Sequence, residues 1–181
     1  MRRTTVRIAF CGVLAALMLA VMLLGGMAPL ATYACPALAG ALVIPAVWEF
    51  GTPTGAVLYA AGAVLSLILC PDKEAASLFL FFLGWYPVLR PRLQHLQNRP
   101  IRLGVKLLLF NLSICLVYAL LLFVFPLPDL IKEAETWTGL FLAGFLLLGN
   151  VAFLLYDLLL ARVTDLYVYR LRPKLRTAVK H

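Results

Sequence analysis

Residues 8–24, IAFCGVLAALMLAVMLL, decide the fold class of this chain. The stretch has no charged side chain, and the uncharged run continues to residue 48. A helix needs about 20 apolar residues to cross roughly 30 Å of hydrocarbon. Further uncharged runs follow at residues 50–71, 75–89, 107–128 and 136–156. The sequence therefore predicts an all-α, polytopic membrane protein built as a helical bundle.

The positive charges predict how this bundle is oriented. Apart from Lys73 and Lys132, every Lys and Arg lies near the N-terminus, between Arg90 and Lys106, or from Arg162 onward. Basic segments stay on the cytoplasmic side because Lys and Arg are disfavoured for translocation during insertion. We therefore expect both termini and the central basic loop to be cytoplasmic.

That orientation constrains the number of spans, since an even number of crossings must separate successive basic clusters. Glycines and prolines break the first apolar run into two, so four crossings fit before the central loop and two after it. The fourth segment is short for a span, but parity requires it to cross. The prediction is one transmembrane domain, residues 1–181, with six spans at about 8–24, 37–50, 54–70, 74–89, 104–125 and 137–161.

Composition excludes several classes of protein. The chain is 64% hydrophobic and 13% charged, whereas soluble domains are about a quarter charged, so no soluble domain is expected. The net charge of +8 belongs to edges that would face anionic lipid headgroups. Membrane lipids are therefore expected partners, and a nucleic-acid partner is not.

No constellation of residues indicates an enzyme. His95 and His181 have no nucleophile and paired acid nearby, and the four cysteines show no metal-ligand spacing. We expect no catalytic residue, no metal site and no cofactor. Cys35 and Cys70 both fall at the predicted outer face, where a disulfide is geometrically possible, although two unpaired buried thiols are the favoured interpretation.

The first helix carries a row of small side chains, Gly12, Ala16 and Ala20, at every fourth position. Residues four apart lie on one face of a helix, and small side chains let another helix approach closely. The row indicates either a partner-docking face or packing within the bundle itself.

The segment Ala16-Leu-Met-Leu-Ala20, taken together with the six predicted spans and the cytoplasmic termini, makes the chain similar to the S components of energy-coupling factor transporters. The resemblance implies a substrate-capture subunit for a vitamin or other micronutrient in the bacterial cytoplasmic membrane. It also implies docking of this face on a coupling membrane subunit that works with ATPases. The segments Pro71-Asp-Lys-Glu-Ala-Ala76 and Gly84-Trp-Tyr-Pro87 look like those of uncharacterised bacterial membrane proteins often placed near the S components.

Three residues are candidates for contact with the substrate. Tyr33 belongs to the loop 25–36, which we expect either to fold as a lid over the outer helix ends, or to fill the bundle there or dip into the lipid interface. Lys73 could meet an anionic ligand or be a solvated interface lysine. Asn150, in the middle of the sixth span, could contact a ligand or form an interhelical hydrogen bond.

Asp157 lies within the sixth span, where an unpaired carboxylate costs free energy, so we expect it to pair with Arg162 or Arg90. An ion pair of this kind would be structural or part of a docking surface. The alternative function is a six-span membrane scaffold of the rod-shape morphogenesis type, which predicts a filled interior and partner contacts at the cytoplasmic edges.

Overall fold

The computed structural model describes residues 2–25, 31–94, 98–123 and 139–172, and these residues form helices with no strand. The chain runs through α1 (Arg2–Leu23), α2 (Ala31–Ala41), α3 (Val43–Phe50), α4 (Thr52–Leu69), α5 (Lys73–Leu78), the π-helix η2 (Phe79–Leu83), α6 (Tyr86–Gln94), α7 (Arg99–Phe123), α9 (Gly139–Leu166) and the π-helix η3 (Tyr167–Leu171).

Five helical stretches of the described residues are long and apolar enough to cross a membrane. They are Thr4–Leu23, Ala31–Phe50, Thr52–Leu69, Arg99–Leu121 and Leu142–Arg170. This confirms the prediction of an all-helical chain with several membrane-spanning helices. The fourth predicted span, 74–89, is not among the five, because its helix is interrupted.

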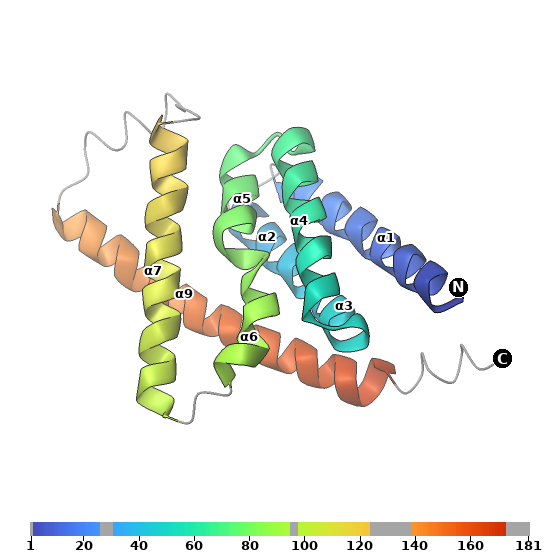
Figure 1. The fold of residues 1–181 in the computed structure, drawn as a ribbon. Helices are drawn as coiled ribbons and strands as arrows, with labels where there is room; N and C mark the ends of the chain where they lie inside the picture. The colour runs from blue at the N-terminus through green and yellow to red at the C-terminus, as the bar shows by residue number, and fades with distance from the viewer. Residues whose placement is uncertain (1, 26–30, 95–97, 124–138, 173–181) are drawn as a thin grey trace.

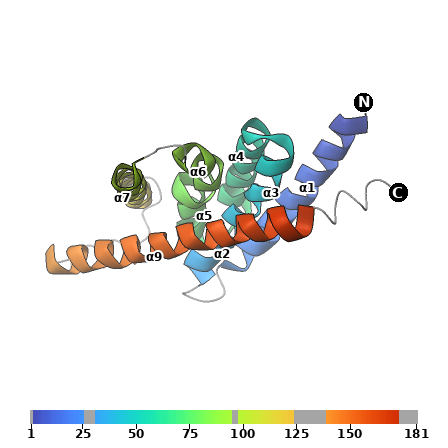
Figure 2. The ribbon, with the colours of Figure 1, turned by 90° about the horizontal axis from the view of Figure 1, so that it is seen from below.

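The helix ends fall on two sides of the bundle. Toward the lower side of Figure 1 lie the start of α1, the α3–α4 turn, the end of α6, the start of α7 and the end of α9. The ends of α1, α4 and α7 lie toward the upper side. Figure 2 shows α9 running along one flank of the bundle, past α7, α6 and α3. The segments that border the central and C-terminal basic clusters therefore share one side.

The second helical stretch begins at Ala31, whereas the predicted span begins at residue 37. Pro36 lies inside α2; a proline donates no backbone hydrogen bond, but helices packed among other helices tolerate this loss. Tyr33 consequently lies in the first turn of α2 instead of in a loop. The remainder of the expected lid, residues 26–30, and the expected acidic outer loop, residues 126–135, lie outside the described residues.

A turn at Gly51 joins α3 to α4. Gly51 has φ of 87° there, a backbone conformation that glycine adopts without the steric cost of a side chain. Its amide still donates to the carbonyl of Val47 at 3.0 Å, which closes the end of α3.

The segment 73–94 consists of α5, η2, a turn at Gly84 and Trp85, and α6. The Gly84 amide donates to the carbonyl of Phe79, five residues earlier, at 2.8 Å. That bond leaves the carbonyl of Leu80 without its usual helical donor. Pro87 in turn has no amide hydrogen for the carbonyl of Leu83.

Side chains from other helices satisfy both freed carbonyls, as buried backbone polar groups require. The hydroxyl of Tyr59, on α4, donates to the Leu80 carbonyl at 2.6 Å. The hydroxyl of Tyr156, on α9, donates to the Leu83 carbonyl at 2.9 Å. The interrupted helix is therefore joined to α4 and α9 by specific hydrogen bonds, which the sequence pattern does not reveal.

The two larger of three hydrophobic clusters in the described residues hold most of the bundle together. Side chains of α1 to α5 and η2 form one cluster, with Met18, Val43, Ala63 and Phe79 almost fully buried. The other cluster joins α7 and α9 to the interrupted helix through aromatic rings, and the rings of Phe110 and Phe153 stack with centroids 5.1 Å apart. Aromatic pairs of this kind add to the energy of area burial.

Candidate functional site

Helix α1 has two contrasting faces. Leu14, Met18 and Met22 are buried against α2 and α4. The predicted docking residues Gly12, Ala16 and Ala20 are all exposed on the opposite side. A Cβ atom added to Gly12 would meet no other atom within 4 Å. The small side chains therefore do not pack inside the described bundle, and this face is open to lipid or to another helix.

Tyr33 lies in the first turn of α2, close to the start of α5. Its ring is 49% exposed, and its hydroxyl donates to Oε1 of Glu74 at 3.0 Å. Glu74 belongs to the first turn of α5. The contact joins the start of α2 to the start of α5 and leaves part of the tyrosine ring accessible.

Lys73, at the first position of α5, is used for a structural purpose in this conformation. Its ammonium donates to the carbonyls of Leu67 and Cys70, at 2.9 and 3.0 Å. A cation at the carboxyl end of a helix satisfies carbonyls that lack donors and complements the helix dipole. Asp72 caps α5 by accepting from the Ala75 amide at 3.0 Å. Lys73 thus caps the carboxyl end of α4.

Asn150 forms an interhelical hydrogen bond, one of its two expected roles. Its amide donates to Oδ1 of Asn111 at 3.2 Å, and the Asn111 amide donates back to Oδ1 of Asn150 at 3.1 Å. Each amide also donates to a carbonyl four residues earlier on its own helix. The reciprocal pair joins α7 to α9 at a depth where unpaired amides would be costly.

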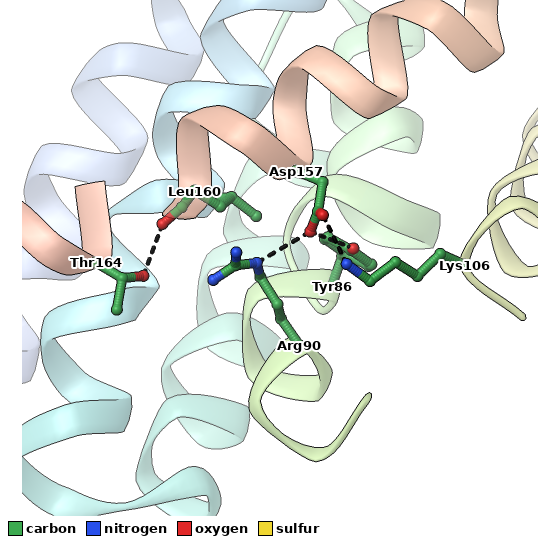
Figure 3. A network of polar contacts seen from close by, with 6 residues as sticks. All are labelled: Tyr86, Arg90, Lys106, Asp157, Leu160 and Thr164. Carbon is green, nitrogen blue, oxygen red and sulfur yellow. Dashed lines mark hydrogen bonds and ion pairs between the residues drawn. The ribbon is translucent and has the colours of Figure 1, made fainter. Parts of the chain in front are cut away.

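Asp157 is the centre of a network of charged side chains from three helices (Figure 3). Its Oδ1 accepts from Nε of Arg90 at 3.0 Å and from the hydroxyl of Tyr86 at 2.7 Å. Its Oδ2 accepts from Nζ of Lys106 at 2.6 Å. Arg90 is therefore the partner, while Arg162 is exposed. The network joins α6 and α7 to α9.

Lys106 and Tyr86 are the members of this network that sequence reasoning missed. Lys106 is the last cation before the apolar part of α7, so it lies deeper than the rest of the central basic cluster. That position is the signal that could have identified it, because a cation at such depth needs a counter-charge. Tyr86 carries no comparable signal, since an interface tyrosine is ordinary.

The cysteines carry no cross-link in the described residues. Cys35 and Cys70 are both buried and both free, and the Cys70 thiol donates to the carbonyl of Met22 at 3.2 Å. In the same part of the chain, no three His, Cys, Asp or Glu side chains come close enough to hold a metal ion. The site chemistry present is hydrogen bonding and ion pairing between helices.

Comparison with known proteins adds no relative. No family model, curated protein or solved structure matches this chain.

Proposed function

We propose that this chain is a subunit of a larger membrane assembly, which it joins through the exposed face of Gly12, Ala16 and Ala20. In that assembly it is the substrate-capture subunit of an energy-coupling-factor-type uptake system, with six spans and both termini in the cytoplasm. The observation that carries the proposal is that α1 buries Leu14, Met18 and Met22 on one face, while the row of small residues Gly12, Ala16 and Ala20 is exposed on the other. Without a hydrophobic force between helices in lipid, such small-residue faces allow the close contact on which association depends.

Capture of a substrate is supported by the outer end of the bundle. Tyr33, half exposed beside the Glu74 carboxylate, presents an aromatic ring and polar groups next to the loop that joins α1 to α2. A small micronutrient with an apolar ring and a polar edge suits this combination. The substrate itself is a small molecule of unassigned identity.

The docking experiment compares matched variants of α1. Ala16→Trp and Ala20→Trp should prevent co-purification with the coupling membrane subunit and its ATPases, because a bulky ring blocks close helix contact. Leu17→Trp is the control, since Leu17 is 48% exposed but lies on the neighbouring, already bulky side of the helix. Folded Ala16→Trp and Ala20→Trp proteins that co-purify as well as the control would contradict the docking assignment.

The capture experiment examines small molecules that the purified protein retains. Mass spectrometry of the denatured wild-type protein should release a micronutrient, and Tyr33→Ala should retain several-fold less of it at unchanged thermal stability. Leu38→Ala is a control, because this residue is also exposed on α2 but lies further from the outer end.

The second candidate function is a membrane scaffold, favoured by the filled interior of the described residues. Tyr86, Phe79, Phe82, Met18 and Met22 are fully buried, and no buried side-chain polar atom in that part of the chain lacks a hydrogen bond. A scaffold would retain no small molecule and would bind partners at its cytoplasmic edge. A crosslinker placed at position 92, where Arg92 is exposed at that edge, would then capture a partner protein, and one placed at position 16 would not. That result would favour the scaffold function.

A further inference from the structure

We propose that a small pocket between α3, α6 and α9 binds the phosphate of an anionic phospholipid headgroup. The pocket has a volume of about 20 Å³ and is lined by Ile44, Val47, Trp48, Pro87, Arg90, Pro91, Gln94 and Thr164. The pocket lies apart from Tyr33 and from the exposed face of α1, so lipid binding here does not depend on the uptake function proposed above.

The first argument is an imbalance of charge beside the pocket. Arg90 and Lys106 are buried, with side chains 10% and 8% exposed, and they share the single carboxylate of Asp157. The three groups together carry one surplus positive charge. Among the other described acids, Glu49 is paired with Arg172 and Asp165 is exposed. A buried surplus charge is costly, so an anion placed beside it would be stabilised.

The second argument is the direction of the Arg90 guanidinium. Its Nε donates to Asp157, while its far end lies on the side of Thr164, away from Lys106 (Figure 3). With the Gln94 amide turned so that its oxygen faces Arg90, Nη1 and Nη2 both lie 3.3 Å from that oxygen. Within the described residues, the group that meets this edge is therefore the neutral Gln94 amide. A phosphate oxygen would supply the charge-assisted, two-point contact that guanidinium groups favour.

The third argument is the size and place of the pocket. Its volume is a little above the roughly 10–15 Å³ that one water needs, so it admits an oxygen-sized part of a headgroup and not a whole metabolite. Its lining extends to the last turns of α3 and α6, next to the basic segments, and Trp48 is 42% exposed there. Basic pockets between helices at the cytoplasmic face bind lipid headgroups, and aromatic side chains mark the same level of the membrane.

The test is native mass spectrometry of the full chain in detergent, titrated with phosphatidylglycerol or phosphatidylcholine of identical acyl chains. We expect the wild-type protein to prefer phosphatidylglycerol by about tenfold or more, because the choline ammonium of phosphatidylcholine cancels the charge of its phosphate and would add a cation beside Arg90 and Lys106. Gln94→Glu should abolish the preference, because the new carboxylate neutralises Arg90 while the Asp157 contacts stay intact. Arg90→Gln should do the same if it folds. Arg92→Gln, an exposed change one turn away, should retain the preference.

Three results would overturn the proposal: equal binding of the two lipids, an unchanged preference in Gln94→Glu, or an equal loss in Arg92→Gln, which would indicate general attraction to basic edges. A further arm adds millimolar inorganic phosphate. If phosphate displaces the lipid and stabilises the protein equally well without it, the site binds free phosphate and the lipid assignment is wrong. If phosphate has no effect on the retained lipid, the headgroup assignment stands.

Discussion

The hydroxyl of Tyr156 donates a hydrogen bond to the carbonyl of Leu83 at 2.9 Å, in place of the amide that Pro87 lacks. One side chain on α9 thereby stabilises the interruption between η2 and α6. Gly40, on α2, packs against the same two groups, because a Cβ atom there would lie 2.1 Å from the Leu83 oxygen and 2.7 Å from the Tyr156 hydroxyl. Three helices meet at this carbonyl.

Tyr156→Phe should destabilise the protein by about 1–3 kcal/mol, because it leaves a buried carbonyl without a donor. Denaturant or thermal unfolding in a fixed detergent measures the change. Tyr169→Phe is the control, since Tyr169 is 78% exposed and should be nearly neutral. Equal stability of Tyr156→Phe and the wild-type protein would show that this hydrogen bond contributes little.

Gly40→Ala should be strongly destabilising, because the added methyl group overlaps a backbone oxygen that cannot move like a flexible side chain. Overpacking of this kind costs about 1–3 kcal/mol. Gly104→Ala is the matched control: it lies in α7, and its Cβ would meet nothing within 4 Å. The control should be neutral or slightly stabilising, since alanine favours helices over glycine. A comparable stability of both variants would argue against the close approach of α2.

Asp157→Asn should cost about 3–5 kcal/mol, because Arg90 and Lys106 would remain buried without their counter-charge. The double variant Asp157→Asn with Lys106→Met should recover part of this loss, since it removes one of the stranded cations. The unfolding free energies of both are compared with that of Asp165→Asn, an exposed aspartate on the same helix. A double variant no more stable than Asp157→Asn alone would contradict the coupling of these charges.

Membrane orientation is tested by labelling single cysteines in a cysteine-free background. Asn98→Cys, in the central basic segment, should resist a membrane-impermeant reagent added to intact cells and react after permeabilisation. Pro71→Cys, an exposed position between α4 and α5 that the six-span orientation places outside, should react from outside. Labelling of Asn98→Cys in intact cells would rule out the six-span orientation.

The sequence alone determined that the chain is helical and spans the membrane. Uncharged apolar runs as long as residues 8–48 have only this outcome in lipid, because every backbone group must find a partner within the segment. The turn at Gly51 and the cap at Asp72 also follow from the local sequence. In both, the conformation or the hydrogen bond depends on residues within a few positions along the chain.

The tertiary structure alone decided which distant groups satisfy one another. The sequence left the Asp157 partner open between Arg162 and Arg90, and it did not point to Lys106 or Tyr86. Pro87 signals a freed carbonyl, but only the packing of α9 against α6 shows that Tyr156 reaches it. The physical reason is that an ion pair or a hydrogen bond depends on distances of about 3 Å in space, and these are set by how helices pack, not by periodicity along one helix.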